Sequence, residues 1–500
     1  MTLIDYLTIA AARGPGRLAV ADDRRELTYH ELNRASDTLA AALQRHGAGP
    51  GERVGILLPA GVDAVVALWA VLKTGAAYVP LDPATPPARR QMLLSRVAPV
   101  ALVTDMMLGD ATVAVVAPAA AYGPAERTRL PELSPDAPAY LLHTSGSTGV
   151  PKGVMLSHGN AVAFVDWAVA AFDLSPADRV AGLAPLWFDL SILDVFAVAA
   201  AGAALLPVPV ATRALPAELA QFLHVGRVTV LYCVPTALTM LTRAASAAQL
   251  TTLRAVLFAG EVCPPATVRA LWQLAPGVRV ANLYGPTETN VCTWHELERR
   301  DADLPELPIG RPAAGARLRV VTAGREAADG EVGELRVAGP TVASGYWRDP
   351  DHTAQRFTAD PGGPWYRTGD VVVRDTTGVL WFRGRLDRQV KTRGHRVELE
   401  EVEAALSALP EVAAASVVAV EDDMIGRRLL AAVVPQGDAT AAGVRRAAAG
   451  RLPRHAVPAI HLVDTLPRTA TGKADHSAVA AQLSACQPVA ASVPTLAGRR

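Results

Sequence analysis

One loop, residues 144–153, constrains the fold of this chain more than any other stretch, because its glycine and hydroxyl residues suit contact with an anion. The apolar run 139–142 before it predicts a buried strand, and Ser157 begins a predicted helix. Glycine tolerates positive φ, so the loop can turn backbone N–H groups toward phosphate oxygens, while Lys152 adds a point charge. The sequence therefore predicts the order strand, phosphate loop, helix, which is typical of an α/β fold.

Two other interpretations of this loop are weaker. The P-loop of kinases and GTPases has the pattern G-x-x-x-x-G-K-[ST], whereas here Pro151 precedes the lysine and Gly153 follows it. A flexible glycine-serine linker would be neutral, but Pro151 and Lys152 stiffen and charge this stretch.

Length and composition limit the classes of protein that remain. A chain of 500 residues exceeds what one hydrophobic core usually serves, so we expect at least two domains. A net charge of +0 argues against nucleic acid or anionic lipid as the main partner. The four cysteines show no C-x-x-C spacing, which suits a reducing cytoplasm. No signal peptide is evident, and the longest apolar stretch, 195–211, is interrupted by Gly202 and Pro207, so we expect a cytoplasmic protein with no membrane partner.

Lysine is rare in this chain. The 48 basic residues include lysine only at positions 73, 152, 391 and 473. Lysine and arginine differ in charge distribution and hydrogen-bond geometry, so a lysine kept in such a chain is expected where arginine would not serve. We expect Lys73 to be structural and the other three to lie in functional stretches.

The loop resembles the phosphate-binding signature of the adenylate-forming superfamily, which includes acyl-CoA ligases, luciferases and the adenylation domains of nonribosomal peptide synthesis. Residues 72–83 also resemble an early motif of amino-acid adenylation domains. The resemblance covers roughly residues 20–476 and implies a large N-terminal α/β domain of mixed and parallel sheets with a β-rich subdomain, followed by a small mobile α+β lid. It also implies that ATP contacts the loop at Thr144, Ser145, Gly146, Ser147, Thr148, Gly149 and Lys152.

The stretch 228–236 predicts a strand that ends at a proline turn, 253–260 predicts a second strand, and a third precedes Asn282. We expect the carboxyl ends of these strands to line one crevice, where open α/β sheets bind ligands. These ends carry the remaining residues expected to bind ATP in the N-terminal domain: Gly260, Glu261, Asn282, Tyr284, Thr287 and Glu288. Tyr284 offers a ring for stacking adenine, Asn282 an amide for its amino edge, and Thr287 a hydroxyl for the α-phosphate. Glu288 offers a carboxylate for Mg²⁺. The alternative for residues 284–288 is a simple turn before a helix.

Asp189 separates the substrate classes. On periodicity alone, Asp189 and Asp194 fit the N-terminal acids of an amphipathic helix. The resemblance instead implies that Asp189 holds the ammonium of an α-amino acid, a group that acyl-CoA and aryl-acid ligases need not bind. Matching the family's pocket positions one at a time gives Asp189, Leu190, Leu193, Tyr232, Leu257, Ala259, Leu283, Val291 and Cys292.

This lining is apolar apart from Asp189 and the phenol of Tyr232, so a charged or amide side chain would lose water without replacement, at a cost of about 2 kcal/mol or more. The bound side chain should be small and aliphatic. The lining resembles that of stand-alone L-prolyl carrier-protein ligases of antibiotic pathways. Proline offers a secondary ammonium for Asp189 and three ring carbons for the leucines. Valine and other small amino acids stay open, because one methylene is worth only about 1 to 3 kcal/mol in such a pocket.

Charge density rises between Gly384 and Glu398, where we place the domain boundary. The resemblance implies that Asp370 binds the ribose hydroxyls, Arg385 reaches the nucleotide, Asp387 is the hinge and Gly394 lies beside the incoming thiol arm. The alternative is a solvated basic linker. The predicted division is a 1–386 adenylation core, a 387–480 lid and a 481–500 flexible tail.

The segment 469–473, Thr-Ala-Thr-Gly-Lys, closes the lid. The resemblance implies that Lys473 swings into the active site and neutralises charge on the carboxylate and α-phosphate in the transition state. The family's usual ending, Asn-Gly-Lys-Val-Asp-Arg, is here Thr-Gly-Lys-Ala-Asp-His, so the lysine is kept and only its flanking contacts differ. Lys473, Glu288 and Thr144 are the expected catalytic residues.

The sequence as a whole predicts a two-step ligase that forms an aminoacyl-AMP from ATP with Mg²⁺ and then transfers the acyl group to the phosphopantetheine thiol of a separate peptidyl carrier protein. No carrier motif and no second catalytic module follow the lid motif in the sequence. The rivals are an acyl-CoA or aryl-CoA ligase of the same fold and a non-catalytic nucleotide-binding protein.

Overall fold

The computed structural model describes residues 1–107, 113–126, 130–146, 151–360, 363–422, 425–468 and 474–485. Ser147, Thr148, Gly149, Lys473 and the tail from residue 486 onward lie outside the described residues, so their predicted roles stay predictions. None of the helices in the described part combines the length and apolar character needed to span a bilayer.

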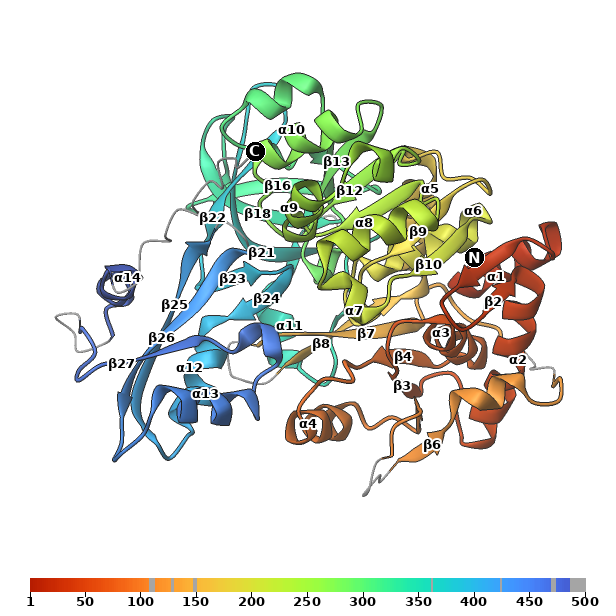
Figure 1. Cartoon of the computed structure of the whole chain (residues 1–500), viewed down its shortest axis with the longest axis horizontal. Coiled ribbons are helices and arrows are strands. Elements are labelled where there is room, and N and C mark those ends of the chain that lie inside the picture. Colours follow the sequence, from red (N-terminus) through yellow and green to blue (C-terminus); the bar gives the residue numbers. More distant parts are fainter. Residues whose placement is uncertain are drawn as a thin grey trace, which may run out of the picture.

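Nine of the described strands form a largely parallel sheet that carries the predicted crevice (Figure 1). In spatial order they are β15 (Arg311–Pro312), β14 (Thr293–Glu296), β13 (Arg279–Tyr284), β12 (Ala255–Phe258), β11 (Val230–Cys233), β9 (Arg179–Gly182), β10 (Ala204–Pro207), β1 (Leu18–Ala21) and β2 (Glu26–Thr28). The pairings from β1 to β13 are parallel, and the remaining three are antiparallel. The three strands predicted to end at the crevice, β11, β12 and β13, are direct neighbours.

A second sheet of seven described strands carries the loop at 144–153. In spatial order its strands are β19 (Gly345–Tyr346), β8 (Lys152–Ser157), β7 (Pro138–Thr144), β4 (Ala77–Pro80), β3 (Arg53–Leu57), β5 (Ala101–Thr104) and β6 (Ala114–Val116). The prediction that a helix directly follows the loop was wrong, because β8 pairs antiparallel with β7 before the helix begins. The run Val154–Leu156 was too short and too close to Lys152 to stand out as a strand. Ser157 caps the next helix as predicted, accepting a hydrogen bond from the Asn160 N–H at 3.1 Å.

The β-rich subdomain is a third sheet, which brings the predicted ribose and nucleotide residues together. Its strands are β17 (Arg325–Glu326), β16 (Arg317–Thr322), β18 (Val332–Ala338), β21 (Gly363–Arg374), β20 (Phe357–Asp360) and β22 (Leu380–Arg385). Antiparallel pairing of β21 with β22 sets Asp370 directly opposite Arg385.

The C-terminal residues form two small sheets: β23 (Gln389–Thr392) with β24 (His395–Glu398), and β25 (Val412–Asp422) with β26 (Gly426–Pro435) and β27 (Ala459–Leu462). The sequence predicts helices over 399–408 and 440–451 in this region, and they are present as α12 (Leu399–Ser407) and α13 (Ala441–Ala449). An apolar cluster between Val390 and Val457 packs within this part of the chain. In Figure 1 it forms a separate lobe beside the large one.

Helices cover the faces of the two large sheets (Figure 1). They are α1 (Leu3–Arg13), α2 (Tyr29–Arg45), α3 (Val62–Thr74), α4 (Pro87–Val97), α5 (His158–Ala171), α6 (Val198–Ala201), α7 (Val210–Arg213), α8 (Pro216–Val225), α9 (Pro235–Ala244) and α10 (Pro265–Leu274). Two further described helices are α11 (Pro350–Arg356) in the subdomain and α14 (His476–Ala485) in the C-terminal lobe. The spacing of Thr28 and Glu31 in the sequence predicts a capping box, and it starts α2, with the Thr28 N–H donating to Glu31 Oε2 at 2.8 Å.

Helix α3 is apolar on almost every side and lies in the largest core. Trp69 meets Phe196 edge to face, with ring centroids 5.1 Å apart. At the end of the helix, the Lys73 ammonium is 1% exposed and donates to Asn33 O at 2.8 Å, Asn33 Oδ1 at 2.8 Å and Asp37 Oδ1 at 2.7 Å. Three acceptors around one nitrogen suit an ammonium better than a planar guanidinium, so Lys73 is structural as expected.

Replacing Lys73 should therefore reduce stability and leave the chemistry intact. Lys73→Ala removes three hydrogen bonds from a buried ammonium together with its buried aliphatic chain, so we expect a loss of about 3 kcal/mol in the free energy of unfolding, measured by urea titration. Arg24→Ala, at an exposed side chain, is the control and should unfold like the native protein. Equal unfolding free energies for the two variants would contradict the structural role of Lys73.

Candidate active site

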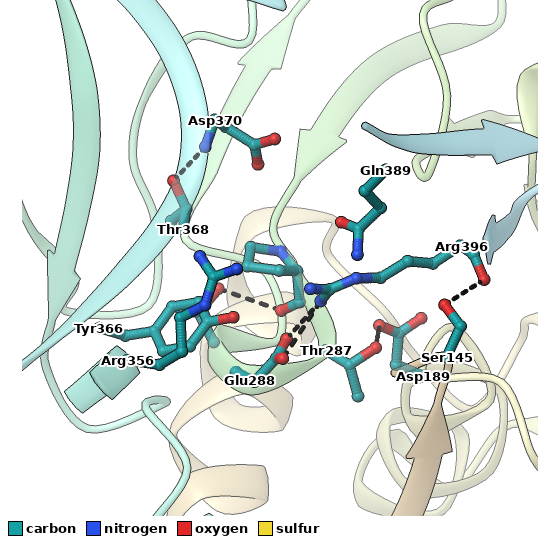
Figure 2. A network of polar contacts seen from close by, with 12 residues as sticks. Ser145, Asp189, Thr287, Glu288, Arg356, Tyr366, Thr368, Asp370, Gln389 and Arg396 are labelled. Atoms are coloured by element: carbon teal, nitrogen blue, oxygen red, sulfur yellow. Dashed lines mark hydrogen bonds and ion pairs between the residues drawn. The ribbon is translucent and has the colours of Figure 1, made fainter. Parts of the chain in front are cut away.

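The carboxyl ends of β7, β11, β12 and β13 meet the β23–β24 hairpin of the C-terminal lobe at one polar network (Figure 2). Residues from all three large sheets reach it: Ser145 follows β7, Thr287 and Glu288 follow β13, and Asp370 lies on β21. The pocket between them is the expected crevice.

Asp189 lies half-buried in the lining of this pocket, in the turn between β9 and the helical residues from Leu193 onward. Its Oδ2 accepts a hydrogen bond from Thr287 Oγ1 at 2.7 Å (Figure 2). Loss of water on burial raises the pKa of the Asp189 carboxyl, and the Thr287 hydroxyl and the Lys391 ammonium partly counter this. A half-buried carboxylate with one hydroxyl donor and an open pocket in front suits a cationic ligand.

Five of the nine residues predicted for the amino-acid pocket line it: Asp189, Leu190, Tyr232, Ala259 and Val291. Leu193, Leu257 and Leu283 are buried in the same apolar cluster but do not line the pocket. Cys292 is separated from them, because it packs with Tyr284 and Ile309 in the cluster of the β-rich subdomain. Sequence matching overlooked Phe188 and Asn290, which also line the pocket.

The pocket wall after β13 has a fixed backbone shape. Asn290 has φ 52° and ψ −131°, a strained conformation that asparagine tolerates better than most residues. A Cβ at Gly285 would lie 1.6 Å from the Asn290 carbonyl oxygen, so only glycine fits there. The turn holds Thr287 and Val291 on the pocket side.

The residues expected to bind the nucleoside form a second part of the site. Asp370, 3% exposed, accepts hydrogen bonds from the Tyr284 hydroxyl and the Arg385 guanidinium. Arg385 also donates to Asp387, at 2.6 Å from Nε, and Arg356 reaches Asp387 at 3.3 Å. Burial alone would raise the pKa of Asp387, but the hydrogen bonds and charge of Arg385 lower it. The guanidinium of Arg385 thus connects Asp387, the predicted hinge residue, to Asp370, the predicted ribose residue.

Three more of the residues predicted to bind ATP lie near these strand ends: Gly260 lines the pocket, and Asn282 and Glu261 have partners within the protein. Asn282 Nδ2 donates to Pro308 O at 2.8 Å, which leaves the amide oxygen for the predicted adenine contact. Glu261 Oε2 accepts from Thr236 Oγ1 at 2.7 Å, and Oε1 accepts from the Gly394 N–H at 2.6 Å. Glu261 therefore joins the large lobe to the hairpin in this arrangement.

Glu288 is completely buried and lies against a cation from the C-terminal lobe (Figure 2). Arg396 Nη1 lies 3.1 Å and 2.9 Å from its two carboxylate oxygens, and the Tyr346 hydroxyl donates to Oε1 at 2.7 Å. Burial would raise the pKa of Glu288, yet Arg396 and Tyr346 hold it below its ordinary value. Both oxygens are engaged, so the carboxylate does not fit a magnesium ion in this position of the lobe, and in the described part of the chain no three His, Cys, Asp or Glu side chains gather as a metal site.

Sequence reasoning assigned no role to Arg396 or Lys391, although both lie at the site. Lys391 is half-buried in the lining of the pocket, and its Nζ lies 5.8 Å from the centroid of the Tyr284 ring. Burial lowers the pKa of its ammonium, and the carboxylates of Asp370 and Asp189 oppose that effect. The scarcity of lysine pointed to position 391, whereas Arg396 carried no comparable signal among many arginines.

The described part of the phosphate loop offers groups that suit an anion. Thr144 Oγ1, at the end of β7, is buried and has no hydrogen-bond partner among the described residues. Lys152, opposite Thr144 in the β7–β8 pairing, has its Nζ 5.6 Å from the centroid of the Tyr346 ring. Ser145 Oγ donates to Arg396 O at 2.9 Å (Figure 2). An orphaned hydroxyl beside a buried ammonium fits a phosphate group.

The residues next to Lys473 lie away from this loop. Asp475 N–H donates to Pro467 O at 2.9 Å, and His476 Nδ1 lies 2.9 Å from Ser416 Oγ on β25. In Figure 1, α14 and β27 lie on the outer side of the C-terminal lobe, far from β7 and β8. The present lobe arrangement brings residues 389–396, and not the chain around α14, to the active site.

Comparison with known proteins agrees with this geometry. The AMP-binding enzyme family matches residues 7–347, and the AMP-binding enzyme C-terminal domain matches residues 401–473. An L-proline–[L-prolyl-carrier protein] ligase of Pseudomonas fluorescens is 38% identical over 495 residues, which cover 94% of this chain and 97% of that protein. A ligase of the same name from Streptomyces coelicolor is 39% identical over 490 residues, covering 90% and 91%.

Solved structures show the same fold. Holo-PA1221, a nonribosomal peptide synthetase protein containing adenylation and PCP domains bound to a vinylsulfonamide inhibitor, superimposes with a TM-score of 0.85 at 25% identity, covering 96% of this chain and 84% of that one. The α/β architecture with a small C-terminal domain is thus confirmed. The chain belongs to the AMP-binding enzyme family and is an ATP-using ligase.

Proposed function

We propose that this enzyme activates a small aliphatic amino acid, L-proline being the best candidate, and transfers it to the phosphopantetheine thiol of a separate peptidyl carrier protein. The observation that carries the proposal is Asp189, a half-buried carboxylate at the end of a pocket with an otherwise largely apolar lining. An ammonium satisfies that carboxylate, and a short aliphatic ring fits Leu190, Ala259 and Val291. The names of the relatives in Pseudomonas and Streptomyces support the same substrate.

In the first step, a carboxylate oxygen of the amino acid attacks the α-phosphorus of ATP. A phosphorus–oxygen bond forms, the bond to the β-phosphate oxygen breaks, and pyrophosphate leaves with the electron pair. The protein's contribution is positioning and charge neutralisation, through Thr144 and Lys152 at the phosphates, Asp370 at the ribose and Asp189 at the ammonium. Lys473 would supply the second cation at the reacting centre.

In the second step, the thiol sulfur attacks the acyl carbon, the thiol proton is released, and AMP leaves as the acyl–phosphate bond breaks. The lobe arrangement described above supports an assignment to this step, because Gly394 lies against Val234 and Phe188. A Cβ at Gly394, whose φ is +78°, would lie 2.4 Å from Val234 Cγ1, so a side chain there would obstruct this contact.

Glu288 is the one residue that we propose as a protein ligand of Mg²⁺. A hard cation with phosphate oxygens as further ligands suits a single carboxylate, but Arg396 would have to withdraw before Glu288 could act as a ligand. The two positions of the C-terminal lobe would therefore give Glu288 different partners: the metal when the lobe is rotated away and Arg396 when it is as seen here.

Pyrophosphate exchange into ATP tests the function directly. The assay runs the first step backward and forward, and we would compare the twenty standard amino acids with salicylate and a fatty acid. A dominant L-proline signal is expected. Exchange with an aryl or fatty acid and with no amino acid would mean that Asp189 has been misassigned and that the enzyme is an acyl-CoA or aryl-CoA ligase.

Asp189→Asn should weaken amino-acid use by roughly a hundredfold in kcat/KM while the KM for ATP changes little, because the ammonium loses its counter-ion in a buried site. Asp173→Asn, at a side chain that is 79% exposed, is the matched control. Unchanged amino-acid kinetics in Asp189→Asn would remove the ammonium assignment.

The same carboxylate should give amino-acid use a pH dependence. Burial raises the pKa of Asp189, so on acidification it takes up a proton at a higher pH than an ordinary aspartate does. Only the ionised form attracts an ammonium, so kcat/KM for the amino acid should fall as pH decreases through that raised pKa. The pH profile of kcat/KM, measured with limiting amino acid, should lose this acidic decrease in Asp189→Asn. An acidic decrease of equal size in the native enzyme and the variant would contradict the assignment.

Lys473→Ala should abolish adenylate formation and spare the second step. The variant would be given synthetic aminoacyl-AMP and a pantetheine thiol, and thioester formation followed by mass spectrometry, alongside pyrophosphate exchange. Loss of exchange with retained thioester formation is expected, because the cation acts on the α-phosphate. Arg445→Ala, at an exposed side chain of α13, is the control. Equal losses in both steps would refute this division of roles.

A further inference from the structure

A buried ion pair joins the two lobes away from the pocket. Arg89, on α4 of the large lobe, places its Nη2 2.7 Å from Glu401 Oε1, on α12 of the C-terminal lobe. The two side chains are only 12% and 5% exposed. Neither residue lines the pocket, so their burial is not explained by contact with substrate.

Around this pair, the large lobe contributes mainly positive charge. His143 lies near both Arg89 and Arg96, which reinforce the effect of burial in lowering its pKa to about 4. On the opposing lobe, burial first, and then His395, Arg89 and Arg393, lower the pKa of His455 well below its ordinary value. The imidazoles of His395 and His455 stack with centroids 3.7 Å apart, and both stay neutral at physiological pH. Glu401 is thus the carboxylate that pairs with Arg89, while the other carboxylate nearby, Asp82 of the large lobe, faces Arg454 of the C-terminal lobe.

A buried ion pair between lobes favours one position of the C-terminal lobe more than it adds to the overall stability of the protein. The attraction of two buried charges is largely offset by their loss of water, whereas one buried charge without its partner is strongly unfavourable. Rotation of the lobe would separate α4 from α12 and return both groups to water, where neither needs the other. Removing one partner therefore penalises only the arrangement in which the other remains buried.

We propose that Arg89 and Glu401 form a latch that selects this lobe position, which makes them positioning residues for the thiol-transfer step. The assignment to that step rests on the function proposed above. The latch acts through the lobe that carries Gly394 and Arg396 and touches no reacting atom. Adenylate formation, which uses another position of the lobe, does not depend on it.

The chain offers matched controls on both helices. Arg90 follows Arg89 on α4, and Glu400 precedes Glu401 on α12, where it pairs at 3.5 Å with Arg388 of its own lobe. Arg90→Ala and Glu400→Ala therefore remove the same charges from the same helices and leave the Arg89–Glu401 pair in place. The reversed pair, Arg89→Glu with Glu401→Arg, restores opposite charges across the interface.

The lobe position can be measured without knowing the carrier protein. Spin labels on cysteines introduced at Val225, which is 69% exposed on α8, and at exposed Arg445 on α13 report the distance between lobes by pulsed electron resonance. Cys233, Cys263 and Cys292 are buried, and Cys486→Ser removes the remaining thiol. We expect the population at the distance of this structure to fall about tenfold relative to the rotated one in Arg89→Ala and Glu401→Ala, to persist in the controls and to return in the reversed pair.

Kinetics provide the second arm. With free D-pantetheine as the acceptor, thioester formation should fall about tenfold in the two single variants and pyrophosphate exchange should not change. Equal distance distributions in all variants, or equal losses in exchange and thioester formation, would overturn the latch. Failure of every amino acid to support exchange in the native enzyme would refute the proposed function instead, and the distance measurement would still decide whether the pair holds the lobe.

Discussion

The contact between Glu288 and Arg396 holds the active site in the arrangement described here. A carboxylate with no exposed surface must have a counter-charge, and Arg396 supplies it from a lobe that begins about a hundred residues later in the chain. The same hairpin brings Gly394 to Glu261 and the backbone of Arg396 to Ser145. The C-terminal lobe therefore contacts the active site through polar groups that pair with polar groups of the large lobe.

Three carboxylates, those of Glu288, Asp370 and Asp189, lie at the active site, and each has a different set of partners. Glu288 has a full counter-ion, and Asp370 lies between a phenol and a guanidinium. Asp189 has the Thr287 hydroxyl, the Leu190 backbone N–H and the more distant Lys391 charge, and the Glu288 charge opposes their effect. The charge of Asp189 is the least neutralised of the three, and Asp189 lines the pocket, where a cationic ligand would supply the counter-charge.

Much of the architecture could be predicted from residues close together in sequence. The capping box at Thr28 and the strand end before Gly260 depend on local patterns, and the family resemblance extended these to the lobes. The strand predicted to end before Asn282 instead continues to Tyr284, because β13 pairs with β14 through these residues. Strand β8 was not predicted, because a short apolar run next to glycines has no clear strand pattern of its own and forms a strand here by pairing with β7. Cys292 was assigned to the pocket by matching, but its thiol turns toward the subdomain and lies 3.5 Å from Tyr284 O.

The sequence by itself determined the family, the phosphate loop, the order of the motifs and the carboxylate that faces the pocket, because these depend on residue identity along the chain. The tertiary structure alone decided which charges neutralise one another. Arg396 with Glu288 and Arg89 with Glu401 are 108 and 312 positions apart, and no local pattern relates them. Such pairs form only when the two lobes are set against each other, since the cost of burying each charge arises from that packing.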